Sequence, residues 1–290
     1  MSRRPVLGAI VMASTLVAAV IGSAEPSEAK RVDQGFPKGG KSPATQIEPA
    51  ETESLAVEPV PTGSTAPDVV FMSSFDEFVL EQRWLDGSVY GEWLSRYDGY
   101  GRTTVLAEGV GGGAALAQTP KAATRPEDTH ASLVISQQTV GDLQLDVRLR
   151  TARQLRTPTP NGWEVAWVLW HYEHDHRFYY FVPKPNGWEL GKVDNSKRDP
   201  GGTECIWPTY SNCRYPGAQR FLATGSNKAF PVGHWYDVRI RQVGPAITVS
   251  VDGAHLVTFQ DDESPYLSGS VGLYSEDAEV RFDDVTVVRP

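Results

Sequence analysis

The sequence predicts an all-β protein in which two antiparallel sheets stack as a sandwich. Three observations lead to this prediction. Strand patterns follow one another along the chain, turn signals of Gly, Pro, Asn and Asp separate them, and no helical period of useful length appears. The turn signals recur about every 8–12 residues, as in β-sandwiches and barrels. Two stacked sheets also explain why many strands have one apolar and one polar side.

The first clear strand is residues 141–151, which alternate strictly between apolar and polar side chains. Residues 163–172 are apolar on both sides, so we expect a central strand there. Residues 177–183 follow after a short polar turn and complete a hairpin. The turn at 185–188 leads into another strand at 189–194.

The C-terminal part continues the pattern. Residues 234–243 alternate again, and residues 246–260 form the clearest hairpin of the chain. Its turn is Asp252-Gly253, a pair that accepts the positive φ angles of a tight primed turn. Residues 268–288 supply the last two strands.

Residues 1–29 have the pattern of an export signal. Arg3 and Arg4 precede the apolar stretch 7–22, and small residues suitable for cleavage follow at 22–24 and 27–29. The apolar stretch is short for a membrane span, and an uncleaved anchor is the alternative. We therefore expect a secreted protein whose mature chain has no membrane span.

Residues 30–68 are predicted to be a disordered linker. They are rich in Pro, Gly, Ser, Thr and Glu, and their apolar residues show no period. Such a segment does not bury enough surface to offset the entropy of ordering it. This leaves residues 69–290 as one sandwich domain, which we expect to be a monomer.

Composition narrows the choice of partner. A net charge of −9 argues against nucleic acid and anionic lipid, which attract basic surfaces. Eight Trp and eleven Tyr residues favour a glycan or oligosaccharide, because aromatic rings stack on the C–H faces of sugars. Cys205 and Cys213 enclose a short loop and predict a local disulfide in an oxidising compartment, with two free thiols as the alternative.

Polar residues on the alternating strands predict a sugar-binding groove on one sheet. The expected ligand-binding residues are Asp146, Arg148, Arg150, Trp170, Lys192 and Arg239, and Glu164 is expected beside them. Arginine forks bind oxygen groups directionally, and an aromatic ring adds a stacking surface. The alternative is a solvated sheet face whose charges keep it soluble.

Histidines gather at residues 171–176, HYEHDH. His171 ends a strand and is a candidate general base beside Glu164. His174 and His176 with their acidic neighbours resemble a metal cluster in composition only, because their spacing is poor for a metal site. A polar turn is the alternative.

The segments 179–194, 234–244, 247–253 and 269–287 together resemble concanavalin A-like jelly-roll domains. Among these they look most like the secreted domains grouped with 3-keto-disaccharide hydrolases and laminin-G-like modules. The resemblance covers about residues 70–290, and its motifs indicate the fold better than the activity. One departure matters: retaining endoglucanases of this fold carry an E-x-D-x-E strand, whereas Glu164 stands alone here.

The resemblance also implies a structural Ca²⁺ between the first and last strands. Asp76 and Asp284 would supply carboxylate oxygens, the ligands that Ca²⁺ prefers. The alternative is that both residues cap strand ends. No motif indicates a nucleotide cofactor.

Three functions follow from these predictions. The first is an exported carbohydrate-active domain that resembles the 3-keto-disaccharide hydrolases, with Glu164 or His171 as the base. The second is a non-catalytic lectin-like or adhesion module. The third is a polysaccharide lyase in which Arg148 or Arg150 neutralises a uronate.

Overall fold

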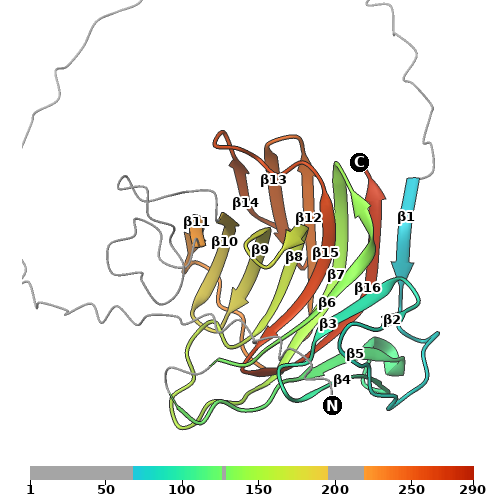
Figure 1. The fold of residues 1–290 in the computed structure, drawn as a ribbon. Coiled ribbons are helices and arrows are strands. Elements are labelled where there is room, and N and C mark those ends of the chain that lie inside the picture. The colour runs from blue at the N-terminus through green and yellow to red at the C-terminus, as the bar shows by residue number, and fades with distance from the viewer. Residues whose placement is uncertain (1–67, 126–128, 195–218) are drawn as a thin grey trace, which may run out of the picture. The chain divides into compact units, whose positions relative to one another are not determined.

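The computed structural model describes residues 68–125, 129–194 and 219–290, and these form two stacked antiparallel sheets of eight strands each (Figure 1). Among them the only helical element is the short 3₁₀ turn η1 (Val110–Gly112), so none of their helices could cross a membrane. The predicted concanavalin A-like jelly roll is confirmed. The expected export signal and the pair Cys205–Cys213 lie outside the described residues.

The first sheet has the strand order β14-β13-β12-β7-β16-β5-β4, with β1 also paired to β16. Its strands are β1 (Asp68–Ser73), β4 (Arg102–Leu106), β5 (Ala115–Thr119), β7 (Leu143–Gln154), β12 (Tyr236–Val243), β13 (Ala246–Val251), β14 (Ala254–Gln260) and β16 (Ala278–Arg289). The first and last strands of the domain therefore lie side by side, with Met72 opposite Thr286.

The second sheet has the order β11-β10-β9-β8-β15-β6-β3-β2. Its strands are β2 (Val89–Tyr90), β3 (Trp93–Tyr97), β6 (Ala131–Val140), β8 (Ala166–His174), β9 (Arg177–Lys184), β10 (Gly187–Asp194), β11 (Gln219–Gly225) and β15 (Gly269–Glu276). The predicted hairpin of β8 and β9 is present, with Trp170 opposite Tyr179. β8 is central, as its two apolar sides predict.

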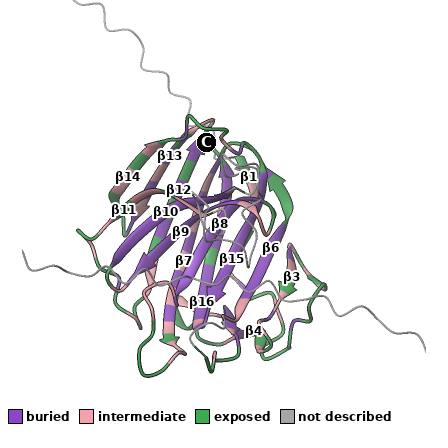
Figure 2. Ribbon diagram, turned by 60° about the vertical axis from the view of Figure 1, so that its left-hand side comes forward, coloured by how far each residue is buried: buried purple, intermediate pink, exposed green. Residues whose placement is uncertain are grey.

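The main core lies between the sheets. Alternate residues of β7 and β12, such as Leu145, Val147 and Ile240, point inward and pack against Val168 and Phe181 of the second sheet. Full burial of each such side chain contributes about 1.5–3 kcal/mol. Figure 2 shows the buried residues running along the strands of both sheets, while the edge strand β14 is more exposed.

The hairpin between β13 and β14 turns at the predicted dipeptide. Asp252 has φ 55° and Gly253 has φ 75°. Both angles are positive, as a primed turn requires, and such a turn matches the right-handed twist of the two strands. The turn chemistry of this hairpin was therefore readable from the sequence.

A second apolar cluster lies on the outer side of the second sheet. Along β8, Trp167 and Leu169 belong to this cluster, whereas Val168 and Trp170 belong to the main core. Side chains alternate between the two sides of a strand, so the second sheet is apolar on both sides. The sequence predicts Trp170 on the outside of the sandwich, but the structure has Trp170 in the main core and Trp167 on the outer side.

Candidate functional site

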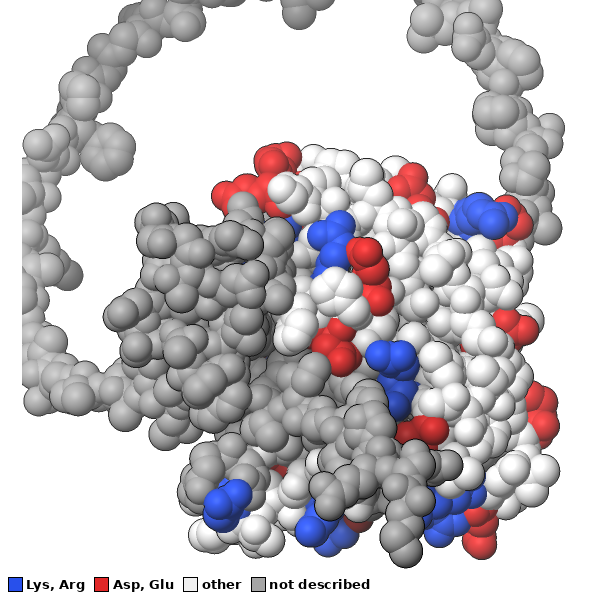
Figure 3. Space-filling view, in the orientation of Figure 1, with Lys and Arg blue, Asp and Glu red and all other residues white. Residues whose placement is uncertain are grey.

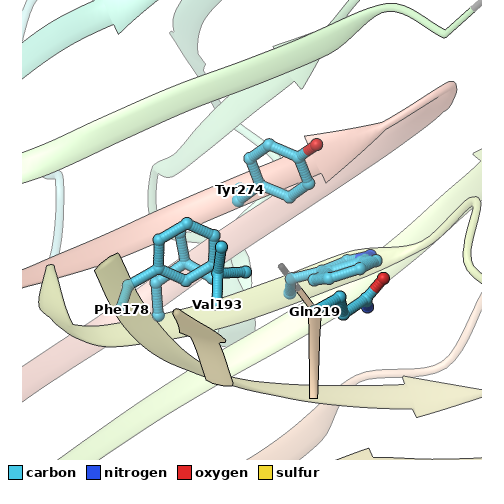
Figure 4. Close-up of a pocket in the computed structure, with 6 residues that line it drawn as sticks. Phe178, Val193, Gln219 and Tyr274 are labelled. Carbon is cyan, nitrogen blue, oxygen red and sulfur yellow. The ribbon is translucent and has the colours of Figure 1, made fainter. Parts of the chain in front are cut away.

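The outer cluster of the second sheet surrounds a small pocket with a cavity volume of about 10 Å³, room for about one water molecule. Side chains from five neighbouring strands line it (Figure 4): Trp167 and Leu169 from β8, Phe178 from β9, Val193 from β10, Gln219 from β11 and Tyr274 from β15. Most of this lining is aromatic or aliphatic, and one amide and one phenol add polar groups. The pocket is therefore a shallow hollow in an aromatic surface, on which a ligand would lie rather than be enclosed.

The rings of the pocket hold one another in place. The ring centres of Trp167 and Tyr274 lie 5.3 Å apart, edge to face, and those of Trp167 and Tyr180 lie 5.2 Å apart. Gly191 on β10 leaves room for Tyr180, since an added Cβ would come within 2.2 Å of the Tyr180 hydroxyl oxygen. The amide of Gln219 donates a hydrogen bond to that hydroxyl at 2.9 Å. The apolar floor is thus preorganised.

Tyrosine hydroxyls and charged groups border the aromatic floor toward β3. Tyr172 donates a hydrogen bond to Asp175 at 2.7 Å. Burial, together with this bond, raises the pKa of Tyr172. Tyr97 on β3 lies within electrostatic range of Asp175 and Arg96, and burial raises its pKa as well. Both phenols are therefore neutral at physiological pH, and the Tyr172 proton is already donated to Asp175.

Glu276 lies on the same side of β15 as the pocket residue Tyr274, two positions further along the strand. Its side chain is only 4% exposed. Among the described residues its carboxyl group makes no hydrogen bond or ion pair. Burial, followed by the negative charges of Asp277 and Glu164, raises the pKa of Glu276 to about 8. The group is therefore mostly a neutral carboxylic acid at pH 7.

Glu164, the first predicted catalytic residue, lies near Glu276 and away from the arginine face of the first sheet. Arg156 joins two carboxylates, Glu164 at 2.5 Å and Asp277 at 2.9 Å. Burial raises the pKa of both acids, while the Arg156 charge opposes that shift. The second oxygen of Glu164 is buried without a hydrogen-bond partner. The expected grouping of Glu164 with Arg148 is wrong.

Four predicted residues do lie together, on the outer side of the first sheet: Asp146, Arg148 and Arg150 on β7 and Arg239 on β12. Each takes part in an ion pair. The pairs are Arg239–Asp146 (2.5 Å), Arg148–Asp237 (2.8 Å), Arg148–Asp284 (3.1 Å) and Arg150–Glu108 (3.1 Å). Opposite charges on adjacent strands thus satisfy one another, which is the arrangement of a solvated sheet face.

The other predicted groove residues are buried in the sandwich. Trp170 lies in the main core at 0% exposure and donates a hydrogen bond to Gln242 at 2.6 Å. Lys192 is also at 0% exposure and pairs with Asp261 at 2.6 Å. The prediction that they line a groove is wrong. Strand alternation predicts the outer side of β7 correctly. It does not tell which side of β8 or β10 faces the other sheet.

His171, the second predicted catalytic residue, is 1% exposed, and each of its ring nitrogens faces a backbone carbonyl oxygen, to one of which the neutral ring donates. Nδ1 lies 2.8 Å from the carbonyl of Tyr266 and Nε2 lies 2.9 Å from that of Gly141. Burial lowers the pKa of the imidazole. With no nitrogen free to reach a ligand, this geometry fits a structural anchor between loops. His174 is the last residue of β8 and His176 lies in the turn that follows; no metal-binding group of three is present among the described residues.

Asp76, Asp283 and Asp284 lie around the η1 loop and β16. The side chain of Asp284 pairs with Arg148, and Asp283 is the residue that approaches Asp76. Asp76 and Asp283 accept backbone N–H bonds from Ala114 (2.7 Å) and Val110 (2.8 Å), on either side of η1. These carboxylates hold the η1 loop against β16. The Ca²⁺ site at Asp76 and Asp284 stays a prediction.

Sequence reasoning missed the aromatic pocket and Glu276. The available signal was the alternation in residues 272–276, GLYSE, where Tyr274 and Glu276 share one side of a strand next to the apolar β8. An apolar strand predicts burial between the sheets. In β8, however, Trp167 and Leu169 lie on the outer side of the second sheet and line the pocket.

Comparison with protein-family models identifies the family. The model of the 3-keto-alpha-glucoside-1,2-lyase-like domain matches residues 80–288, and the chain belongs to this family. No curated protein sequence matches it.

Similar solved structures include a carbohydrate-binding module of family 66 from Bacillus subtilis (13% identity, 68% of this chain and 95% of that chain, TM-score 0.45). Another is a protein of unknown function with a galectin-like fold from Bacillus subtilis (10% identity, 77% and 96%, TM-score 0.46). A third is described with endo-acting O-glycanases that members of the human gut microbiota express to initiate mucin breakdown (13% identity, 77% and 99%, TM-score 0.47).

Proposed function

We propose that this member of the 3-keto-alpha-glucoside-1,2-lyase-like domain family binds a carbohydrate on the outer side of its second sheet and cleaves a glycosidic bond there. The observation that carries the proposal is the preorganised aromatic pocket of Trp167, Phe178 and Tyr274 with a buried carboxyl group beside it. Rings stack on the C–H faces of a sugar, and the phenols and the Gln219 amide give directional bonds to its hydroxyls.

The charges around the pocket favour a neutral sugar. Its six lining residues include no Lys or Arg. The nearest described acid on the same strand, Glu276, is mostly neutral at pH 7. A uronate would therefore lose hydration without gaining an ion pair at the pocket floor. The polysaccharide lyase hypothesis loses its support for this reason, because Arg148 and Arg150 lie on the other sheet in ion pairs.

The family's name refers to a lyase that acts on 3-keto glucosides, and we expect this chemistry here. A ketone at C3 of a glucoside makes the C2–H bond acidic, and loss of that proton allows the C1–O bond to break by elimination. Every glycosidic cleavage needs a proton on the departing oxygen when that oxygen leaves as an alcohol. A neutral carboxylic acid beside an aromatic sugar platform suits this task.

A non-catalytic binding module is the second candidate. Glu164 and Asp277 are both held by Arg156, so neither is free as the second carboxylate that a typical glycosidase uses. Under this alternative the aromatic pocket binds the same class of sugar and no product appears.

The test is a glycan array on the domain, followed by titration of any hit and a product assay with the hit and with its C3-oxidised form. We expect Trp167→Leu to weaken glycan affinity about 10-fold or more, because the ring platform is lost (about 1.4 kcal/mol per factor of 10). Trp235→Leu is the matched control, since Trp235 stacks with Arg150, a residue of the first sheet. Equal affinity of both variants and the wild type would remove the proposed site.

We also propose that the chain is secreted and that Cys205 and Cys213 pair, as the sequence predicts. Mass spectrometry of protein from the culture medium checks both points. A chain cleaved near residue 24 or 29, with one disulfide, is the expected result.

A further inference from the structure

We infer that Glu276 is the proton donor of this site, the residue that delivers a proton to the glycosidic oxygen as the bond breaks. This inference rests on the proposed function and adds a catalytic role for a named residue. Glu276 lies on β15 with its side chain on the pocket side, two residues beyond the lining residue Tyr274. The carboxyl group is nine-tenths buried and has no hydrogen-bond partner among the described residues.

Neighbouring buried acids on this side are paired: Glu189 binds Lys184 and Trp163, and one oxygen of Glu164 binds Arg156. Glu276 makes no such bond to a described residue, and its oxygens are not among the enclosed polar atoms that lack a partner, so solvent reaches them. A ligand oxygen that displaces this solvent can accept a hydrogen bond from the neutral carboxyl group.

The groups that face Glu276 keep it protonated. Asp277 follows it in the chain, and Glu164 precedes β8, the neighbour of β15. Arg156 after β7 partly offsets these two negative charges, and it is itself held by both. Tyr274 on β15 and Tyr97 on β3 are also close, and both phenols stay neutral because burial raises their pKa. Burial and two neighbouring acids thus disfavour a third negative charge.

The same proton transfer serves cleavage by elimination and cleavage by hydrolysis. The C1–O bond breaks, its electron pair goes to the glycosidic oxygen, and that oxygen takes the proton of Glu276 and leaves as an alcohol. In elimination the C2–H electrons form the C1=C2 double bond, and the C2 proton goes to solvent water. In hydrolysis a water molecule adds to C1 and gives its other proton to solvent. Solvent then reprotonates the Glu276 carboxylate.

The experiment compares Glu276→Gln with the wild type on two C3-oxidised glucosides, one with a nitrophenyl and one with an alkyl leaving group. A nitrophenolate leaves without help, whereas an alkoxide needs a proton. We expect the variant to lose about 100-fold or more in kcat/KM on the alkyl glucoside and less than about 10-fold on the nitrophenyl glucoside. A merely structural role would lower both rates equally. Glu279→Gln is the control, because Glu279 lies on β16 and pairs with Arg153.

Sugar binding, followed by tryptophan fluorescence, separates the two proposals. If the wild type binds no sugar, the proposed function fails, and the role of Glu276 fails with it. If the wild type binds and cleaves sugar but Glu276→Gln shows equal loss or no loss on both substrates, only the proton donor is overturned. If the wild type binds sugar without cleaving either substrate, the domain is a binding module and Glu276 is not catalytic.

Discussion

The two outer faces of the sandwich are built from the same kind of element and differ in how their side chains are satisfied. On the first sheet, Arg148, Arg150 and Arg239 are partly exposed and pair with carboxylates of neighbouring residues. On the second sheet, rings line a pocket and Glu276 has no partner among the described residues. Ion pairs neutralise the charges of the first face, whereas under the proposed function the second face gains contacts from a ligand.

The comparison teaches that conspicuous charge on a strand is a weak sign of a binding site. Exposed ion pairs contribute about 0–1 kcal/mol each and need no ligand. On the side seen in Figure 3, acidic and basic residues are interspersed and no large area carries one sign of charge. A site for a neutral ligand is better marked by apolar residues on the outer side of a sheet, next to polar groups that burial leaves unsatisfied.

The largest expected effect comes from breaking the buried ion pairs beside the second face. Arg156→Met leaves Glu164 and Asp277 buried without their cation, so we expect a loss of about 3–5 kcal/mol in the free energy of unfolding at pH 7. Urea denaturation measures it. Arg239→Met removes an exposed pair of the first face and serves as the control, with a loss of about 1 kcal/mol or less. Equal losses would contradict the distinction between the two faces.

A smaller effect is expected at His171, which the structure shows as an anchor. His171→Ala removes contacts to two backbone carbonyls and leaves a void, so unfolding should become easier by about 2–3 kcal/mol. Turnover per folded molecule should stay unchanged. Thermal unfolding and kinetics on the same preparation check this. A loss of turnover with unchanged stability would restore the predicted role as general base.

The unpartnered carboxyl group of the second face should make stability depend on pH. The pKa of Glu276 is about 8 in the folded protein against an ordinary value of 4.5. At a pH between these two values, the Glu276 carboxyl group is ionised in the unfolded chain and protonated in the folded chain. Its contribution therefore lowers the free energy of unfolding as the pH rises from about 5 to 8. We expect Glu276→Gln to be more stable than the wild type at pH 8, on the order of 4 kcal/mol, and about equal at pH 4. A constant difference in urea denaturation across this range would show that the group is not buried as an acid.

The smallest effect tests the first face directly. Arg148→Gln removes pairs with Asp237 and Asp284, and we expect a loss of about 1 kcal/mol or less that shrinks as salt is added. Glycan affinity, measured by the same titration as for Trp167→Leu, should not change. An affinity loss of 10-fold in this variant would return the sugar site to the first sheet.

The strand alternation and turn chemistry were sufficient to predict the sandwich. Residues 143–149 and the turn at Asp252-Gly253 appear as the sequence indicates, because strand period and turn residues are local properties. The four polar residues of the first face were also grouped correctly. Trp170, Lys192 and His171 were misplaced, because an apolar or mixed strand does not state which of its sides meets the partner sheet.

By itself, the sequence determined the fold class, the order of the strands along the chain and an aromatic content suited to sugars. Only the tertiary structure decided which side of the second sheet stays outside, and so which rings build a pocket and which acid lies beside it. The physical reason is that burial and electrostatic environment depend on the strands that become neighbours. Burial raises the pKa of Glu276 most, and the charges of Asp277 and Glu164 add to it. Glu164 is more than a hundred positions away in the sequence but close in the folded domain.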